Sequence, residues 1–401
     1  MNILRNGNWL TRDRLTSYPP LFIVFYLLGF AAIAFTAHGL LDYQDRPLGS
    51  DFAAVYAAGT LARDGTPERA YDLLALLTQE RDLFGQETAL FTWNYPPYFL
   101  KIAEWFAALP YLAALGVWQA LTLGLFLFSA HQILPLRIIA PLVLAFPGTF
   151  TNLGHGQTGF AVAGLLLLGA TQLAKRPYLA GVALSLLIFK PHFAFALPLA
   201  LLAGGHWRAI LSGAATFLSL TALTFLAYGA SVWQAFLTHL TQTQNQALEY
   251  SDTGFEKLQS TFAAIRLMGG SVSFAYAAQI TISIVMMAGV MWIWAQRDLD
   301  RRIQFAALLV ASLAAAPYSF DYDMMLLGAA LLCMVAYEME QGFQPWHKSA
   351  LFLVWLAPAL ARPFATATAL PLGLCLIFLM AGLVFQLAQR AHKKPGLKSR
   401  V

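Results

Sequence analysis

The chain has 401 residues, of which 59% are hydrophobic and only 11% are charged, and its formal net charge is +5. An average soluble domain carries about 25% charged residues, so this chain has too few charges to cover a water-facing surface, and most of its surroundings must be lipid. Its two cysteines, Cys333 and Cys375, both lie in apolar runs, which excludes a disulfide scaffold. The cations form no stripe interleaved with aromatic residues, which argues against nucleic acid as a partner. The composition predicts an all-α polytopic membrane protein.

The N-terminal part predicts one span followed by a long polar loop. A helical span needs about 20 mostly apolar residues, and the first such run extends from Leu21 to Leu41. No small-residue cleavage site follows it, so we expect an uncleaved span rather than a signal peptide. Residues 42–105 then form the first long loop.

Within this loop, one segment has the pattern of an amphipathic helix. Four apolar residues recur on one face at helical spacing: Ala70, Leu73, Leu74 and Leu77. Three polar residues face away from them: Asp72, Gln79 and Glu80. We expect this helix to lie in the membrane interface with its apolar face in lipid.

Further apolar runs follow. They cover residues 110–130, 138–150, 159–174, 178–203, 209–228, 272–295, 303–316, 324–337, 349–361 and 367–387. Together with the first span they predict about 10–12 transmembrane or re-entrant helices in a single domain, 1–401. A second long loop lies between two of the runs, at 229–271.

The segment 177–203 contains Lys190-Pro191-His192 at its middle. In one straight helix the lysine would lie near the bilayer centre, at a cost of about 2.5–3.5 kcal/mol, beside a helix-breaking proline. Lys175 precedes the segment and Arg208 follows it, so the positive-inside rule puts both ends on one side. We therefore predict a broken re-entrant hairpin that lines a cavity.

Most lysines and arginines fall on the side that holds both termini, the hairpin ends and the basic tail 390–401. This asymmetry predicts cytoplasmic termini in the plasma membrane, with the tail against anionic headgroups. The loops 42–105 and 229–271 then face outward. No internal repeat is present, which weakens the case for an inverted-repeat transporter.

Polar residues gather at the outward-facing ends of several runs, which predicts one shared pocket near the outer leaflet. The residues are Asp51, Asn94, Tyr95, Gln157, Lys190, His192, Asn245, Lys257, Arg266, Asp321 and Asp323.

An ordered series of short motifs between Gly49 and Leu327 carries a family resemblance. It comprises Ser50-Asp51-Phe52, Tyr56 to Ala58, Gly65, Ala70 to Asp72, Tyr95-Pro96-Pro97, Gly156-Gln157, Arg176-Pro177, Lys190-Pro191 and Pro317 to Asp323. In this series the chain resembles the GT-C type membrane enzymes of glycosyltransferase family 87. The resemblance implies a polyprenol-phosphate-sugar-dependent hexosyltransferase, α-mannosyltransferase-like, with Asp51 as catalytic base. Some members carry histidine where this chain has Phe320 to Asp323, so a second catalytic group there is not carried over.

The chemistry of sugar transfer from a lipid phosphate suits these residues. Phosphate is a good leaving group, so one carboxylate that takes the acceptor's proton could suffice, and we expect Asp51 to be that base, with inversion. The departing phosphate needs cations or N–H donors, for which the candidates are Lys190, His192, Arg266 and Lys257. The expected substrate-binding residues are Asn94, Tyr95, Gln157, Asn245, Asp321 and Asp323.

The expected partners are a polyprenyl-phosphate sugar donor, a glycolipid or glycan acceptor, and the lipid bilayer. No cofactor and no metal site are predicted, because no metal-ligand spacing occurs around the histidines, although assistance by a divalent ion stays open.

Other interpretations stay open. Asp51 could cap a helix that begins at Phe52, and Lys190 could be a structural lysine that snorkels to the interface. The chain could instead be a secondary transporter or flippase with Lys190 as its intramembrane charge. A polymerase or ligase of longer lipid-linked glycans usually has more outer arginines than this chain does.

Overall fold

The computed structural model describes residues 2–244 and 254–393, and within them the only β-structure is three isolated bridges. The first half of the chain forms α1 (Asn2–Asn6), α2 (Arg12–Thr36), α3 (Phe52–Arg63), η1 (Pro67–Tyr71), α4 (Leu73–Phe84), α5 (Pro97–Phe106), α6 (Tyr111–His131), α7 (Leu136–Leu144), α8 (Pro147–His155), α9 (Gly159–Gln172), α10 (Pro177–Ser185), η2 (Leu186–Phe189), α11 (Pro191–Ala194) and α12 (Ala196–Gly204). The second half forms α13 (Trp207–Gln244), η4 (Phe255–Lys257), α14 (Thr261–Leu267), α15 (Val272–Ala295), α16 (Arg301–Ala315), η5 (Asp321–Met324), α17 (Met325–Gln341), α18 (His347–Trp355), α19 (Ala357–Thr368) and α20 (Leu372–Lys393).

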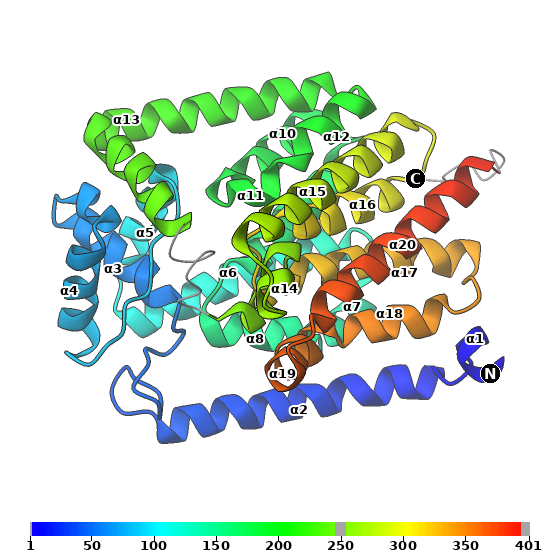
Figure 1. Cartoon of the computed structure of the whole chain (residues 1–401), viewed down its shortest axis with the longest axis horizontal. Coiled ribbons are helices and arrows are strands. Elements are labelled where there is room, and N and C mark those ends of the chain that lie inside the picture. Colours follow the sequence, from blue (N-terminus) through cyan, green and yellow to red (C-terminus); the bar gives the residue numbers. More distant parts are fainter. Residues whose placement is uncertain (1, 245–253, 394–401) are drawn as a thin grey trace.

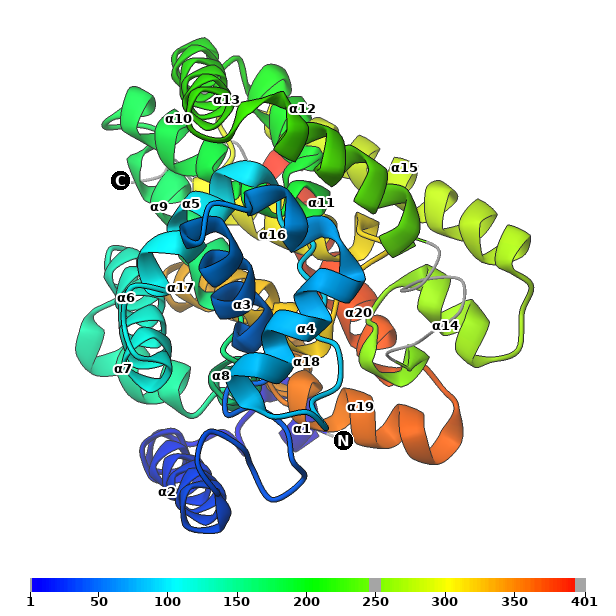
Figure 2. The same cartoon turned by 90° about the vertical axis from the view of Figure 1, so that its left-hand side faces the viewer.

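The helices α2 and α13 lie along opposite edges of the molecule, with the other long helices between them (Figure 1). The helices α3, α4 and α5 gather at one end, which we call the loop end, and Figure 2 looks onto it. The helix α1 and the last turn of α20 lie at the opposite end, which we call the terminal end. The first described helix and the end of the last one therefore share one end of the molecule.

The prediction of an all-α, multi-pass membrane protein is confirmed. In the described residues, six helices are long and apolar enough to cross a membrane, or up to eight if each bent pair counts as one span. The bent pairs are α7–α8, at 63°, and α18–α19, at 67°. Three shorter apolar stretches add to these spans: Gly159–Gln172, Pro177–Phe189 and Pro191–Gly204.

The first span was predicted at Leu21–Leu41, and these bounds are wrong. The helix α2 begins nine residues earlier, because the Thr11 hydroxyl caps its first turn by accepting from the Arg14 backbone N–H. It ends at Thr36, after which Leu41 forms a bridge with His38 and another with Pro47. Polar capping at one end and a tight turn at the other set the limits, rather than hydrophobicity alone.

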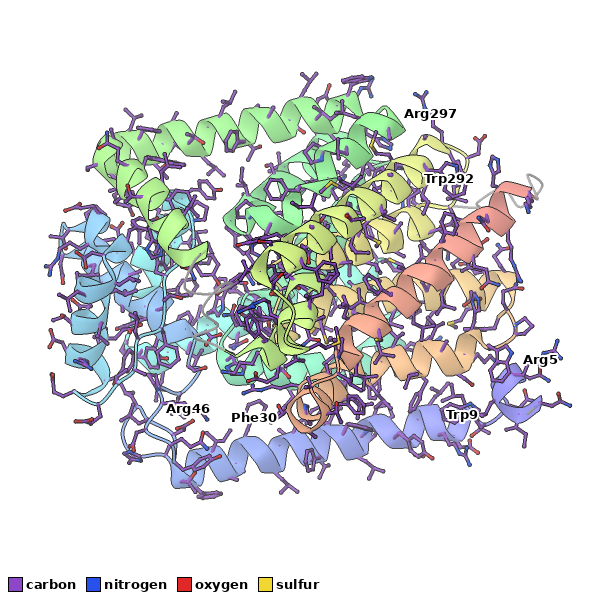
Figure 3. The ribbon with its side chains drawn as sticks, in the orientation of Figure 1. Arg5, Trp9, Phe30, Arg46, Trp292 and Arg297 are labelled. Atoms are coloured by element: carbon purple, nitrogen blue, oxygen red, sulfur yellow. The ribbon has the colours of Figure 1, made fainter. Side chains whose placement is uncertain are left out.

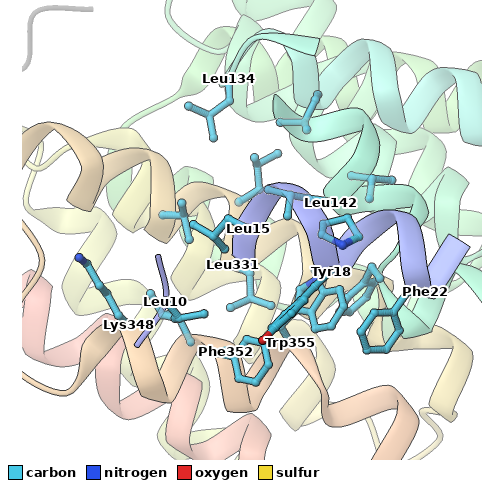
Figure 4. A pocket seen from close by; sticks show the side chains of 18 of the residues that line it. Leu10, Leu15, Tyr18, Phe22, Leu134, Leu142, Leu331, Lys348, Phe352 and Trp355 are labelled. Atoms are coloured by element: carbon cyan, nitrogen blue, oxygen red, sulfur yellow. The ribbon is translucent and has the colours of Figure 1, made fainter. Parts of the chain in front are cut away.

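One face of α2 borders an apolar cavity of about 340 Å³. Figure 4 shows Tyr18, Leu142 and Trp355 around it. Among the described residues that line it, Arg14 and Lys348 are the charged ones.

The segment 177–203 breaks where the sequence placed a break. Lys190 has φ −123° and ψ 74°, outside the helical region, and separates η2 from α11. Lys175, just before the segment, lines the same cavity as Arg297. A Cβ built on Gly205, just after the segment, would lie 2.9 Å from the Arg297 guanidinium. The end of the segment at Gly205 therefore lies beside Arg297, and the other end borders the same cavity as that arginine.

The helix α13 continues past the expected end of its span and into the predicted second loop, 229–271. It bends at Gly229, whose φ of 76° and ψ of −177° belong to a region that is essentially open to glycine only. The part after the bend carries His239, whose Nε2 lies 3.0 Å from Oδ1 of Asn94. The bend thus brings the second loop against the first.

The prediction of an amphipathic helix around Leu73 to Leu77 is right about the helix, which is α4, while its placement in the membrane interface stays a prediction. Leu74 is 72% exposed, whereas Glu80, expected to face away, is completely buried. The Glu80 carboxylate accepts the backbone N–H of Phe91 at 3.0 Å, which ties the helix to the chain that follows it. Helical spacing identified two faces but could not tell which one the rest of the loop would cover.

Candidate functional site

The site is built where α3 begins beside the turn between α8 and α9. The backbone N–H of Asp51 donates to the carbonyl oxygen of His155 at 3.1 Å. Gly156, which ends α8 at φ +65°, has no room for a side chain, because a Cβ there would lie 2.6 Å from Cβ of Phe52. A glycine at this position therefore lets the α8–α9 turn approach the start of α3.

The Asp51 carboxylate is held by neutral donors. Its Oδ2 accepts from Nε2 of Gln157 at 2.7 Å, and its Oδ1 accepts from Oγ of Ser50 at 3.3 Å. The same Ser50 oxygen lies 2.8 Å from Nδ1 of His155, which is itself 4.0 Å from Asp51 Oδ1. The Asp51 side chain is 29% exposed, so its carboxylate is oriented by the protein and still reachable from outside.

The capping interpretation of Asp51 is wrong. The residue occupies the N-cap position of α3, since the helix begins at Phe52, but its side chain makes no capping hydrogen bond. The bonds from Gln157 and Ser50 use the carboxylate instead. A capping requirement therefore does not explain an aspartate here.

Gln157 is oriented in turn by its other neighbours. Its Oε1 accepts from the backbone N–H of Thr158 at 3.1 Å and from the Tyr95 hydroxyl at 3.4 Å. These contacts leave the amide nitrogen to face Asp51. Gln157 therefore joins the start of α3 to Tyr95, which lies in the segment before α5.

A second polar group lies at the break before α11. The Lys190 ammonium donates to Oδ1 of Asp323 at 2.7 Å, and the two side chains are 7% and 1% exposed. Oδ2 of Asp323 accepts from the Phe320 backbone N–H at 3.0 Å. Lys190 is thus a buried, ion-paired lysine, and the interpretation that it snorkels to the interface is wrong.

The aromatic ring of Tyr322 lies between these two groups. The Lys190 ammonium is 5.1 Å from its centroid, and the His155 ring is 6.2 Å from it on the Asp51 side. Beside it, Asp321 lies 3.7 Å from Nη1 of Arg362, a residue that is 39% exposed. The structure therefore brings Asp51, Gln157, Lys190, Asp321 and Asp323 together in one network.

The charges of Asp51 and Asp323 affect the pKa of two tyrosines outside the spans, Tyr95 and Tyr318. Burial, with the charges of Asp323 and Asp51 added to it, raises the pKa of the Tyr95 hydroxyl. The same three causes raise the pKa of Tyr318, with Asp51 acting more strongly than Asp323. Both hydroxyls therefore stay protonated at neutral pH and can donate hydrogen bonds.

The remaining predicted residues lie around this network or outside the description. His192 stacks edge-on against Tyr318, with ring centroids 6.3 Å apart. Nη1 of Arg266 donates to the carbonyl oxygen of Gly270 at 2.8 Å, and its guanidinium lies 5.3 Å from the Phe255 centroid. Lys257 ends η4, next to the bridge between Leu258 and Phe320. Asn245 lies outside the described residues.

Sequence reasoning missed five contributors to the network: Ser50, His155, Tyr318, Tyr322 and Arg362. Each stands within a segment that the motif series or the outer turns had marked, except Arg362. Arg362 comes from α19, and only the fold brings it to Asp321. Across residues 2–244 and 254–393, no group of three or more His, Cys, Asp or Glu side chains is placed to hold a metal ion.

The chain thus combines a helical, multi-pass membrane fold with a partly exposed carboxylate that the protein orients. The sequence model of glycosyltransferase family 87 matches residues 93–317, more than half of the chain, and the chain therefore belongs to this family of glycosyltransferases. The match includes Tyr95, Gln157 and Lys190, but Asp51 precedes it. Searches of the curated proteins and of the solved structures gave no match.

Proposed function

We propose that this glycosyltransferase is of the GT-C type and moves a hexose, mannose-like, from a polyprenyl-phosphate donor to a hydroxyl acceptor, with Asp51 as general base. The acceptor oxygen bonds to the anomeric carbon while the bond from that carbon to the phosphate oxygen breaks. The electron pair leaves with the lipid phosphate, and the acceptor's proton moves to Asp51. Attack from the face opposite the phosphate inverts the anomeric centre.

The observation that carries this proposal is the state of the Asp51 carboxylate. Its hydrogen bonds come from an amide and a hydroxyl, and the nearest positive charge, if His155 is protonated, is 4.0 Å away. Among the described residues no strong ion pair neutralises this carboxylate, and its partial exposure lets an acceptor hydroxyl reach it. Lys190, by contrast, is already neutralised by Asp323.

The donor phosphate needs a cation that is not already held in an ion pair within the network. Arg362 is the more accessible cation, since its contact with Asp321 is long and its side chain is 39% exposed. The second loop adds Lys257 and Arg266, close to the bridge that joins this loop to Phe320. We propose that the leaving phosphate binds to these three residues. Lys190 and His192 then have a structural role next to the phosphate site and do not contact the phosphate.

The proposed orientation follows from charge. Arg5 and Arg297 lie at the terminal end, and Arg46 lies at the opposite end (Figure 3). Because cytoplasmic segments carry the excess of lysine and arginine, we propose that the terminal end faces the cytoplasm and that the network opens to the outer face of the plasma membrane.

Replacement of Asp51 by asparagine tests the proposal. The amide keeps the size of the side chain and one acceptor oxygen but removes the base. We expect turnover to fall by about 10²–10⁴-fold, measured as transfer from polyprenyl-phosphate mannose in proteoliposomes. The matched control is Asp64→Asn, an exposed aspartate just beyond the far end of α3, which should leave turnover unchanged. Normal turnover by folded Asp51→Asn protein would remove the assigned role.

A further inference from the structure

A second polar cavity lies at the terminal end, away from the Asp51 network. Its volume is about 1350 Å³, and it is bordered by the ends of α6 and α9, the segment 295–302, α17 and the last turn of α20. Arg297, on its rim, projects at the terminal end in Figure 3. We call this cavity the basin. Nothing in the sugar-transfer chemistry makes use of it.

The basin has an excess of positive charge. Four cations line it: Lys175, Arg297, Arg301 and Arg302. Three carboxylates line it as well: Asp298, Asp300 and Glu340. Arg302 is committed to two of them, at 2.8 Å to Asp300 and 2.7 Å to Glu340. Together, the four cations and three carboxylates leave a net charge of +1 among the described lining residues.

Arg301 supplies the second observation. Its Nη1 is buried and has no hydrogen-bond partner among residues 2–244 and 254–393. A buried donor on a charged group costs more than an ordinary one when it is unpaired, so native structures rarely leave such an atom empty. His206 is affected by the same positive charges. Burial, and then the charges of Arg301 and Arg297, lower its pKa to about 4.

We propose that the basin binds a phosphate-ester anion, with the Arg301 guanidinium as its central contact and Lys175 and Arg297 at its rim. A guanidinium presents parallel N–H donors that match the oxygens of a phosphate. The net charge of +1 across the described lining favours an anionic ligand. Apolar residues share the lining, among them Ile133, Ala170 and Leu299, and these suit the carbon chain of an ester rather than a bare inorganic ion.

A membrane lipid headgroup and a soluble phosphate offer the same chemistry, and a thermal-shift titration separates them. The full chain in a neutral detergent is titrated at fixed ionic strength with short-chain phosphatidic acid, with short-chain phosphatidylcholine or with inorganic phosphate. We expect phosphatidic acid to raise the melting temperature saturably and phosphatidylcholine to leave it unchanged. A saturable rise with inorganic phosphate as well would identify the site as one for phosphate groups in general, which also supports the proposal.

Two variants tie the effect to the basin. Arg301→Gln should weaken the apparent affinity for phosphatidic acid by at least about 10-fold. Lys175→Gln, at an exposed rim position that folding does not depend on, should weaken it by about 3-fold and keeps the test open if Arg301→Gln does not fold. The matched control is Arg137→Gln, an exposed cation of α7 outside the basin. The proposal is overturned if no ligand gives a saturable shift, or if the foldable basin variants respond like the control.

Discussion

The Asp51 network and the basin differ in how their charges are balanced. The network holds three carboxylates, Asp51, Asp321 and Asp323, against the two cations Lys190 and Arg362. The basin holds four cations against three carboxylates. An acid surplus favours taking a proton from an approaching hydroxyl, whereas a cation surplus favours holding an anion. The two regions therefore suit different ligands.

The two regions also differ in the partners of their charged side chains. In the network, the lysine that a sequence reader would assign to the donor phosphate is bound to Asp323 and covered. In the basin, one arginine serves the internal carboxylates, and a neighbouring arginine keeps a buried nitrogen without a partner. The role of a cation therefore depends on which carboxylates the fold places next to it. A neighbouring proline in the sequence does not reveal those carboxylates.

The largest expected effect on stability tests whether Lys190 is structural. Lys190→Met leaves the Asp323 carboxylate buried without its cation, which should cost about 3–5 kcal/mol of folding free energy. The double variant Lys190→Met, Asp323→Asn should recover part of that loss, because no bare charge remains. The measurement is the melting temperature in detergent, followed by tryptophan fluorescence.

The chain provides a matched pair for this test. Lys101 lies 2.9 Å from Glu104, and its side chain is 41% exposed. Lys101→Met should therefore cost no more than about 1 kcal/mol. If Lys190→Met melts like wild type yet loses turnover, Lys190 acts on the substrate instead, and the contrast drawn between network and basin fails at this residue.

A smaller effect is expected for the side chain that orients the base. Gln157→Leu removes the 2.7 Å bond to Asp51 Oδ2 while keeping a similar volume. We expect kcat to fall by about 10–100-fold, with KM changed much less, because the carboxylate is misplaced rather than absent. Steady-state kinetics on the lipid-linked donor measures both parameters.

The control for Gln157 is Gln172→Leu, a glutamine of α9 that pairs with Gln132 at 2.6 Å, well separated in sequence from the site. It should leave both kinetic parameters unchanged. If Gln157→Leu raises KM and spares kcat, Gln157 binds substrate, as the sequence analysis expected of it, rather than positioning Asp51.

Much of the fold follows from hydrophobic periodicity and from a few breaking residues. The apolar runs gave the spans, and the Lys190-Pro191 step gave the break before α11. The ends of α2 and the extension of α13 beyond Gly229 were missed, because they depend on a threonine cap and on a backbone bend that hydropathy does not report. A long apolar stretch shows which residues can lie in lipid, but it does not show at which residue the helix begins.

The sequence predicted which residues belong to the candidate site better than it predicted which of them pair with one another. The outer turns contained Asp51, Gln157, Lys190 and Asp323, and the fold joins them into one network. Pairing could not be read from the sequence, since Lys190 and Asp323 are far apart along the chain and a contact between them depends on how α11 packs against η5. The same limit hid Arg362.

The smallest expected effect concerns Glu80, a carboxylate of the first long loop with no place in the network. Burial raises its pKa from 4.5 to about 8. The folded protein thus holds this proton more tightly than the unfolded chain, so stability is greatest below pH 4.5 and falls by about 1.4 kcal/mol per pH unit as pH rises towards 8. Glu80→Gln stays neutral and can still accept from Phe91, so its melting temperature should drop less between pH 6 and pH 7 than that of wild type (on the order of a few degrees).

The control is Asp82→Asn, which removes an exposed acid from the same helix and should keep the wild-type pH dependence. Turnover of Glu80→Gln should match wild type, because the carboxylate contacts Phe91 rather than the Asp51 network. Equal pH dependence in Glu80→Gln and wild type would mean that Glu80 is ionised in the folded protein, and burial would then not separate structural from chemical carboxylates on this side. A difference of the expected sign would show that Glu80 is protonated in the folded protein at neutral pH.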